Sequence, residues 1–271
     1  LNCPAKLNLN LSVLSKRVDG MHEIKTHFQL INLFDELLIK KSSSKSISVK
    51  TNLNSSIDGK NNIVFFAIKA LSDHIGKEIF CDVEIEKNIP LGGGLGGGSS
   101  NAAAALIGVN ALFKLGLSIK ELMMLGEKLG ADVPFFVYGK NAHASGIGEI
   151  LIEAKKQVDT KYLLLFPNIH SSTKELFSKW DKLTKASQEF INLSEENSFL
   201  PIFLENNEEI KKNFNDLNKM NSFKLSGTGS TFFCAYNDLE EIEKTMKKIP
   251  TKWRHFFCEP LQCSPLLTLI E

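Results

Sequence analysis

The sequence predicts an α+β fold with two lobes. Strand-like and helical patterns are mixed along the chain, without the regular strand–helix–strand alternation of a parallel sheet. The chain has 271 residues, which is long for one hydrophobic core but suits two small domains or one two-lobed enzyme. Because the pattern of elements restarts near residue 150, we expect an N-terminal domain at residues 1–150 and a C-terminal domain at residues 151–271.

The composition narrows the class of partner. Hydrophobic residues make up 43% and charged residues 23% of the chain, as in ordinary globular proteins. The net charge is +1, so no global field attracts nucleic acid or an anionic membrane. The apolar runs are too short to span a bilayer, and the start has no signal-peptide pattern. We therefore expect a small-molecule partner, no nucleic acid and no membrane.

The five cysteines point to a reducing compartment. Their number is odd and they form no C-x-x-C pair, which argues against a disulfide framework and a structural zinc site. We expect a bacterial cytoplasmic protein that is a monomer or weak dimer. Because the chain begins with Leu1 rather than Met, a plastid-type organelle is the alternative.

Two local patterns define the elements of the N-terminal part most clearly. Residues 6–13 alternate strictly between apolar and polar side chains, which predicts a half-buried strand with Lys6 and Asn8 on one face. Ser118 and Glu121 form a capping box for a helix that ends near Gly130. The other expected elements are strands at 27–39 and 81–86, a loop with one weak strand at 42–60, and helices at 62–75 and 101–115.

The C-terminal part predicts a second set of strands and helices. Ser172 and Glu175 cap a short helix, and a second glycine turn lies within residues 224–230. The other expected elements are strands at 162–166, 231–236 and 253–258, an interrupted helical stretch at 185–220, and a helix at 239–248.

The most informative motif is the glycine-rich segment from Pro90 to Ser100. Six glycines fall within seven positions, Gly92–Gly98, between a strand and a helix. Glycine lets the backbone adopt positive φ and approach a ligand closely, so that its N–H groups surround an anion. The following helix adds partial positive charge, and Ser99 and Ser100 add hydroxyls for phosphate or metal. The natural ligand is a di- or triphosphate.

Other interpretations of the glycine run fit less well. A Walker A loop requires a Lys after the last glycine, and none follows Gly98. The dinucleotide fingerprint matches Gly92, Gly94 and Gly97, but a run this rich in glycine matches it trivially. The acidic residue expected about 20 positions later is missing. A flexible linker is disfavoured by the ordered segments on both sides.

Four further positions stay ambiguous when each is taken alone. Asp132 has apolar neighbours that predict partial burial and a cationic partner, but a helix N-cap explains it equally well. Lys6 alone reads as a solvent-facing lysine, and His22 alone as a structural histidine. The segment Gly227–Ser230 is either a tight turn or a second phosphate or substrate clamp.

Together these motifs resemble the GHMP kinases. The matching segments are PAKLNL at 4–9, PLGGGLGGGSSNAA at 90–103, GADVPFF at 130–136 and LSGTGS at 225–230. Within that group, KRVDGMH at 16–22 and the glycine run resemble the 4-diphosphocytidyl-2-C-methyl-D-erythritol kinases of non-mevalonate isoprenoid synthesis. The resemblance covers nearly the whole chain. It implies a two-lobed kinase that uses ATP and Mg²⁺ to phosphorylate the substrate's 2-hydroxyl in the cleft between the lobes.

The resemblance assigns roles to matching positions. Lys6 and Asp132 match the catalytic lysine and aspartate. The expected ATP-binding residues are Asn62, Pro90, Leu91, Gly92, Gly93, Gly94, Leu95, Gly96, Gly97, Gly98, Ser99 and Ser100. The expected substrate-binding residues are Asn8, Met21, His22, Thr173, Phe177, Gly227 and Gly229, with His22 at the cytosine edge and Phe177 stacked on the base. No side chain is expected as a dedicated metal ligand, although Ser99 or Ser100 is expected to touch the Mg²⁺.

One position departs from the family pattern. The family has Tyr before the histidine, where this chain has Met21, so a thioether replaces an aromatic stacking partner for the cytosine. The rival interpretations are another GHMP kinase, acting on mevalonate, phosphomevalonate or homoserine, and a non-catalytic protein of the same fold. A dinucleotide-binding oxidoreductase is the third alternative.

Overall fold

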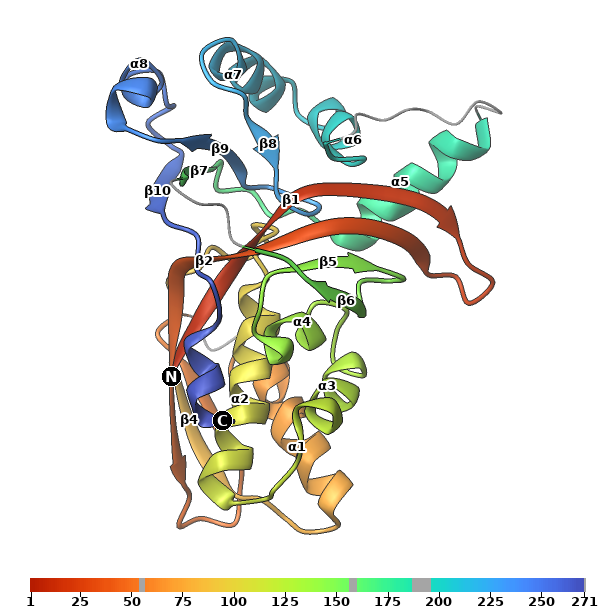
Figure 1. Ribbon diagram of the computed structural model, residues 1–271, viewed down its shortest axis with the longest axis vertical. Helices are drawn as coiled ribbons and strands as arrows, with labels where there is room; N and C mark the ends of the chain where they lie inside the picture. Colours follow the sequence, from red (N-terminus) through yellow and green to blue (C-terminus); the bar gives the residue numbers. More distant parts are fainter. Residues whose placement is uncertain (54–56, 156–159, 187–195, 271) are drawn as a thin grey trace.

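Two β-sheets, each with its own helices, organise the part of the chain that the structure describes (Figure 1). The computed structural model describes residues 1–53, 57–155, 160–186 and 196–270. The strands of the first sheet are β1 (Asn2–Lys16), β2 (His22–Lys41), β3 (Ser48–Thr51), β4 (Cys81–Glu86), β5 (Ala142–Ser145) and β6 (Ile150–Glu153). Those of the second are β7 (Lys161–Phe166), β8 (Lys224–Leu225), β9 (Phe232–Tyr236) and β10 (Arg254–Cys258).

The helices divide between the two sheets. Those of the first sheet are α1 (Ile63–Ile75), α2 (Gly97–Phe113), α3 (Ile119–Glu127), α4 (Val133–Tyr138) and the 3₁₀ turns η2 (Gly59–Asn61) and η4 (Pro265–Leu269). Those of the second are α5 (Thr173–Ala186), α6 (Leu200–Glu205), α7 (Glu208–Asn218), α8 (Glu243–Met246) and the 3₁₀ turn η3 (Leu239–Ile242). We call these two assemblies the first lobe and the second lobe. None of the described helices is both long enough and apolar enough to cross a membrane.

The long β1–β2 hairpin connects the two lobes. In the first sheet the strand order is β3-β4-β2-β5-β6, with β1 paired antiparallel to β2, and in the second it is β10-β7-β9-β8. The hairpin register shifts between Asn8 and Leu11. Beyond this shift Leu11 and Val13 pack in the core of the second lobe, whereas Leu30 packs in the core of the first. The hairpin therefore places Lys6 and Asn8 near the junction of the lobes.

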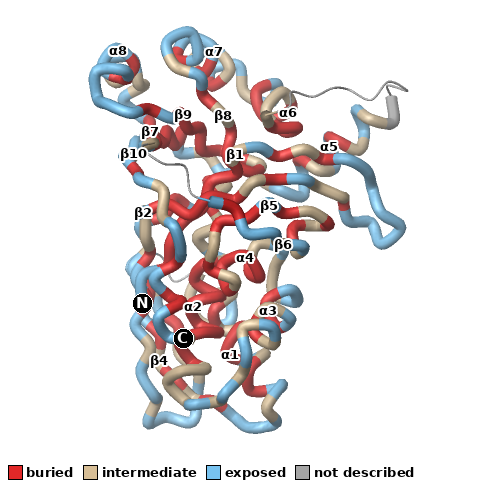
Figure 2. Tube along the Cα trace, viewed as in Figure 1, coloured by how far each residue is buried: buried red, intermediate tan, exposed pale blue. Residues whose placement is uncertain are grey.

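Helix α2 is the central element of the first lobe. It packs against β1 and β2, and both α1 and α4 pack against it. Its residues from Ser100 to Val109 are buried, and four consecutive alanines, Ala102–Ala105, allow neighbouring elements to approach closely (Figure 2). Figure 1 shows α2 running from the side of the second lobe to the far end of the first lobe, so its N-terminus points toward the second lobe.

The expected boundary near residue 150 stays a prediction. Strand β6 pairs with β5 in the first sheet, and Leu266 in η4 returns to the core of the first lobe. The chain therefore ends beside α2, where Figure 1 also shows the two termini.

Most of the expected elements are present, including the weak strand β3 and the capping box of Ser118 and Glu121. The strands expected at 6–13 and 27–39 are longer, at Asn2–Lys16 and His22–Lys41, and three helical expectations were also wrong in extent. Helix α2 begins at Gly97 rather than Asn101, because packing and an αL conformation at Gly96 override the low helix propensity of glycine. The helix capped by Ser172 is α5, which has 14 residues and is longer than the short helix that was expected. The expected helix at 239–248 divides into η3 and α8.

The start of that last segment is capped. The Asp238 side chain accepts hydrogen bonds from the N–H groups of Glu240 and Glu241. Within the expected helical stretch at 185–220, residues 187–195 lie outside the described residues, and α6 and α7 account for the rest.

Candidate active site

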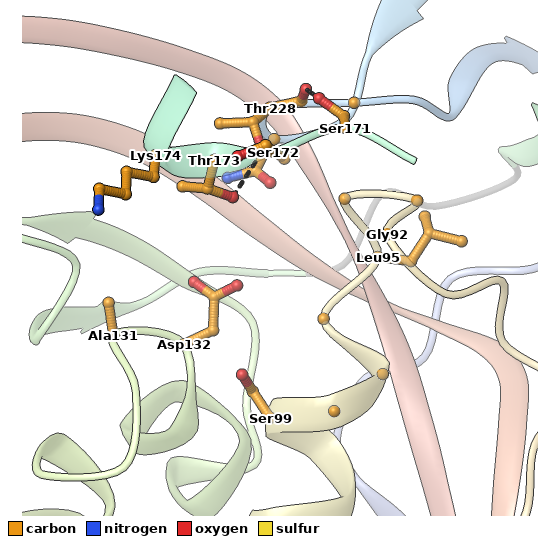
Figure 3. A pocket seen from close by; sticks show the side chains of 18 of the residues that line it. Gly92, Leu95, Ser99, Ala131, Asp132, Ser171, Ser172, Thr173, Lys174 and Thr228 are labelled. Carbon is orange, nitrogen blue, oxygen red and sulfur yellow. Dashed lines mark hydrogen bonds between the residues drawn. The ribbon is translucent and has the colours of Figure 1, made fainter. Parts of the chain in front are cut away.

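A cavity of about 1130 Å³ lies between the two lobes, and nearly all of the residues expected to bind ATP or substrate line it (Figure 3). The first lobe contributes Lys6, the glycine segment and Asp132, and the second lobe contributes the start of α5 and the turn at Gly227–Gly229. Ser100 is the exception, because it is fully buried and does not line the cavity. The structure thus brings together residues that are far apart in the sequence.

Lys6 and Asp132 meet inside this cavity. Lys6 Nζ lies 3.5 Å from Asp132 Oδ2, and the same nitrogen donates a hydrogen bond to Asn8 Oδ1. The Lys6 side chain is only 4% exposed, whereas that of Asp132 is 34% exposed. Asp132 does occupy the N-cap position of α4, but its side chain makes no capping hydrogen bond. The geometry favours the interpretation in which the carboxylate faces a cation and the cavity.

Asn8 links this pair to both glycine turns. Its Nδ2 donates to Thr26 Oγ1 at 2.8 Å, which orients the amide in the hairpin. Its backbone N–H donates to Ser226 Oγ at 3.2 Å, and Ser226 Oγ donates to the Gly94 carbonyl at 3.1 Å. The Lys6 N–H also donates to the Leu95 carbonyl at 3.0 Å. Strand β1, the glycine segment and the Ser226 turn are therefore one hydrogen-bonded unit.

Packing against this unit explains why glycine is needed in the loop. Gly92, Gly94 and Gly96 have positive φ, which other residues rarely adopt. A Cβ on Gly94 would lie 2.1 Å from the Ser226 carbonyl oxygen, and one on Gly96 would lie 2.7 Å from the Phe136 ring. A side chain at either position would collide with the neighbour against which the loop packs.

Gly98 is different from these glycines. Its φ is not positive, a Cβ there would meet nothing within 4 Å, and the residue lines the cavity in the first turn of α2. Glycine in a helix costs about 0.5–1 kcal/mol relative to alanine. Since no contact with the described residues requires that cost, the open space beside Gly98 is available for a ligand.

The start of α2 supplies positive potential to the same space. The first N–H groups of a helix have no intrahelical partner, and those of Gly97–Ser99 lie at the cavity end of α2. No acidic side chain lies in this first turn to compete for them. The arrangement suits an anion such as a polyphosphate.

The serines after the glycine run have different surroundings. The Ser99 side chain lines the cavity on the same side as Asp132 (Figure 3). Ser100 is buried with its hydroxyl unpaired in the described structure, and its N–H donates to the Gly96 carbonyl at 2.9 Å. Between the two serines, Ser99 is therefore the one placed to reach a metal ion or phosphate.

A buried ion pair lies next to the glycine segment and supports it. This pair was not predicted from the sequence. Asp35 is fully buried, forms an ion pair with Lys87, and accepts hydrogen bonds from the N–H groups of Asn88 and Ile89 at 2.8 Å each. Asn101 Nδ2 donates to Asp35 at 3.0 Å, which ties the start of α2 to the same carboxylate. The available signal was an acidic residue, Asp35, within the expected strand at 27–39.

The residues expected at the cytosine lie where the hairpin meets α5. His22 and Phe177 are stacked with ring centroids 4.6 Å apart, and His22 Nε2 lies 2.6 Å from Asp181 Oδ1. Met21 lines the cavity and is 45% exposed, so it is free to contact a ligand. Asp181 was not expected, although its position four residues after Phe177 places both on one helix face.

The remaining expected residues also hold structural roles. Asn62 caps α1 by accepting a hydrogen bond from the Val64 N–H at 3.0 Å. The Thr173 hydroxyl lies 3.0 Å from the Thr228 hydroxyl, which joins the start of α5 to the second glycine turn. Gly227 and Gly229 have positive φ in that turn.

The described residues fit a magnesium ion that is held mainly by the phosphates of a bound nucleotide. They contain no group of three or more His, Cys, Asp or Glu that could hold a metal by itself. Mg²⁺ is commonly bound by one or two carboxylates together with substrate phosphates. Asp132 and Ser99 offer oxygens at the cavity wall for such a site.

Comparison with known proteins identifies the family. The model of the GHMP kinases N terminal domain matches residues 62–140. A 4-diphosphocytidyl-2-C-methyl-D-erythritol kinase of Marinomonas sp. (strain MWYL1) is 37% identical, over 98% of this chain and 88% of the relative. That of Francisella tularensis subsp. novicida (strain U112) is 40% identical, over 90% of each. The chain belongs to the 4-diphosphocytidyl-2-C-methyl-D-erythritol kinase family. It is an enzyme, and a kinase of this family takes its phosphate from ATP.

Solved structures agree with this family. A crystal structure of 4-(cytidine 5'-diphospho)-2C-methyl-D-erythritol kinase has a TM-score of 0.75 and 26% identity, and the match covers 95% of this chain and 97% of that chain. The mevalonate kinase of Methanococcus jannaschii has a TM-score of 0.65 at 17% identity, over 96% and 98% of the two chains. The second likeness shows the shared fold of the GHMP kinases and confirms the predicted α+β class.

Proposed function

We propose that this kinase phosphorylates the 2-hydroxyl of 4-diphosphocytidyl-2-C-methyl-D-erythritol with ATP as phosphate donor. The observation that carries the proposal is the Lys6–Asp132 pair, 3.5 Å apart, in one cavity with the glycine segment. The relatives bearing that enzyme's name support the choice of substrate. The cavity, of about 1130 Å³, is slightly larger than the range of about 300–1,000 Å³ that is typical of ligand pockets.

The glycine segment and the start of α2 bind and orient the phosphates of ATP. Their N–H groups are fixed before the ligand arrives, because the loop is hydrogen-bonded to β1 and to the Ser226 turn. Phosphoryl transfer depends chiefly on positioning and on stabilisation of charge, so a rigid cradle of donors is the main contribution of the loop. The open space at Gly98 lets a phosphate come close to the helix end.

Asp132 serves as the general base that accepts the proton of the substrate hydroxyl. Its side chain is the more exposed member of the pair and is therefore accessible to the substrate. Lys6 is buried beside it and offsets the negative charge that develops on the attacking oxygen. Asn8 holds the Lys6 ammonium in place through its side-chain oxygen.

Mg²⁺, when bound, neutralises negative charge on the phosphates of the bound nucleotide. Ser99 is the residue that would hold it, together with the phosphate oxygens. Asn62 contributes to the ATP site. The cytidine site is formed by Met21, His22, Thr173 and Phe177, and the turn at Gly227–Gly229 also binds the substrate. We propose no nucleic-acid partner. A monomer or weak dimer in a bacterial cytoplasm completes the proposal, and the bacterial sources of the relatives support that location.

A substrate panel tests the proposal. The purified protein is incubated with Mg-ATP and 4-diphosphocytidyl-2-C-methyl-D-erythritol, mevalonate, phosphomevalonate or homoserine, and phosphorus-31 NMR locates the new phosphate. We expect one new phosphomonoester, on the 2-hydroxyl, with the cytidylyl substrate only. Turnover of another alcohol in its place would assign a different GHMP kinase activity, and no turnover of any would indicate a binding protein.

A further inference from the structure

Three side chains on one face of α5 hold the His22 imidazole. Phe177 stacks on the ring at 4.6 Å, Trp180 meets it edge-on at 5.5 Å, and Asp181 Oδ1 lies 2.6 Å from Nε2. Residues 177, 180 and 181 are spaced i, i+3 and i+4, so they project from the same side of the helix. The orientation of the ring therefore depends on the second lobe, although His22 itself belongs to the hairpin of the first sheet.

Asp181 binds the hairpin at two adjacent points. Its Oδ2 pairs with Lys16 Nζ, and Lys16 lies directly opposite His22 in the β1–β2 register. Burial raises the pKa of Asp181, but the hydrogen bonds from Lys16 and His22 outweigh it and keep the pKa below its usual 3.8. The carboxylate, whose side chain is 17% exposed, is therefore ionised at neutral pH.

This contact leaves one ring nitrogen for a ligand. Because Nε2 faces Asp181, a carboxylate that only accepts hydrogen bonds, Nε2 carries a proton. Nδ1 makes no hydrogen bond to the residues that the structure describes, and His22, Phe177 and Asp181 all line the cavity. In this way, the hydrogen bond at one ring nitrogen determines which nitrogen carries the proton and how the ring is oriented.

We propose that Asp181 is a positioning residue for the base-binding end of the cavity. It turns His22 so that Nε2–H points at α5 and Nδ1 is presented to the cytidine base. It also fixes the distance between the hairpin and α5, on which the gap available to the base depends. This inference rests on the proposed function, because it takes the cytidine base to bind at His22.

Two variants of Asp181 separate its contributions. Asp181→Leu removes both the charge and the acceptor, whereas Asp181→Asn keeps an oxygen that can accept from Nε2–H. We expect KM for the cytidylyl substrate to rise roughly tenfold or more in Asp181→Leu and by less in Asp181→Asn. The kcat and the KM for ATP stay near the wild-type values, because Lys6, Asp132 and the glycine segment are untouched. Asp216→Asn, which removes an exposed acid paired with Lys219 on α7, is the control.

Two measurements do not depend on turnover. Calorimetric titration with CDP should show weaker binding to Asp181→Leu than to wild type. Nitrogen-15 NMR should show a His22 ring protonated at Nε2 in the wild type, with its signals assigned by their loss in His22→Gln. In Asp181→Leu, the ring proton of His22 should be distributed more evenly between Nε2 and Nδ1.

The outcomes distinguish this inference from the proposed function. If the wild type phosphorylates no cytidylyl substrate, the proposed function fails, while weaker CDP binding by Asp181→Leu still supports the role of Asp181. Unchanged CDP affinity and unchanged KM in a folded Asp181→Leu variant would overturn the inference. So would a loss of kcat at constant KM, because that result assigns Asp181 to the chemical step.

Discussion

Lys6 Nζ lies 3.5 Å from Asp132 Oδ2 and 5.3 Å from the centroid of the Phe28 ring. The ammonium is thus held between a carboxylate that faces the cavity and an aromatic ring that belongs to the core. Its position is fixed by the fold, whereas the carboxylate stays accessible. This difference in exposure underlies the separate roles that we propose for the two residues.

Replacing Lys6 should reduce turnover far more than binding. Lys6→Met keeps the length of the side chain but removes the charge, and loss of one preorganised electrostatic group costs about 100- to 1000-fold in kcat. The KM for ATP should change little, since the loop is held by main-chain bonds. Steady-state kinetics beside Lys69→Met, an exposed lysine paired with Asp73, provides the check. A Lys6→Met enzyme with half the normal kcat would contradict the role.

Two glycines of the loop should respond in opposite ways to alanine. Gly98→Ala should leave the melting temperature unchanged or raise it, because alanine favours a helix by about 0.5–1 kcal/mol, yet it should raise KM for ATP. Gly94→Ala should lower the melting temperature, because its Cβ would lie 2.1 Å from the Ser226 carbonyl oxygen. Thermal unfolding and ATP kinetics of both variants test this. Normal ATP affinity in Gly98→Ala would show that no ligand uses that space.

Removing Asp35 should destabilise the first lobe. Asp35→Ala leaves Lys87 charged and buried and leaves two main-chain N–H groups unpaired, which costs about 3–5 kcal/mol in the free energy of unfolding. Urea unfolding measures the loss. Asp73→Ala, at an exposed pair on α1, is the matched control and should show no measurable change. An Asp35→Ala protein as stable as the wild type would mean that the pair contributes nothing to the fold.

Mild acid should destabilise the protein through His27. Burial, with a smaller contribution from His143, lowers the pKa of His27 from its usual 6.5. Below pH 6.5 the unfolded state therefore binds more protons than the folded state, so stability present above that pH is lost as the pH falls toward the folded pKa. Melting temperatures at pH 7.5 and pH 5.5 should differ less in His27→Leu than in the wild type. An equal decrease in both proteins would exclude this histidine as the cause.

The secondary structure could be predicted where periodicity and capping agree. The alternation at residues 6–13 and the Ser118–Glu121 capping box predicted a strand and a helix that the structure confirms, although the strand is not half-buried at Lys6 and Asn8, which the second lobe helps to bury. The start of α2 could not be predicted, because Gly97 and Gly98 are poor helix formers whose conformation is set by tertiary contacts. Local propensity carries no information about such contacts.

The residues that line the site could be predicted from the sequence, but the buried carboxylates that hold them in place could not. The resemblance supplied Lys6, Asp132 and the glycine segment, and the structure places them in one cavity. The carboxylates of Asp35 and Asp181 were missed because their partners, Lys87 and His22, are distant in sequence. Burial of such residues becomes visible only when the strands and helices are assembled.

The most direct test of the account is ADP release by the purified protein with Mg-ATP, measured with and without 4-diphosphocytidyl-2-C-methyl-D-erythritol, beside Asp132→Asn. Asn keeps the shape of the side chain but cannot accept the hydroxyl proton, so kcat should fall by about 100- to 10,000-fold. We predict ADP release that requires the substrate in the wild type and is nearly absent in a folded Asp132→Asn variant. Near-normal turnover by that variant would contradict the assignment of Asp132 as the general base.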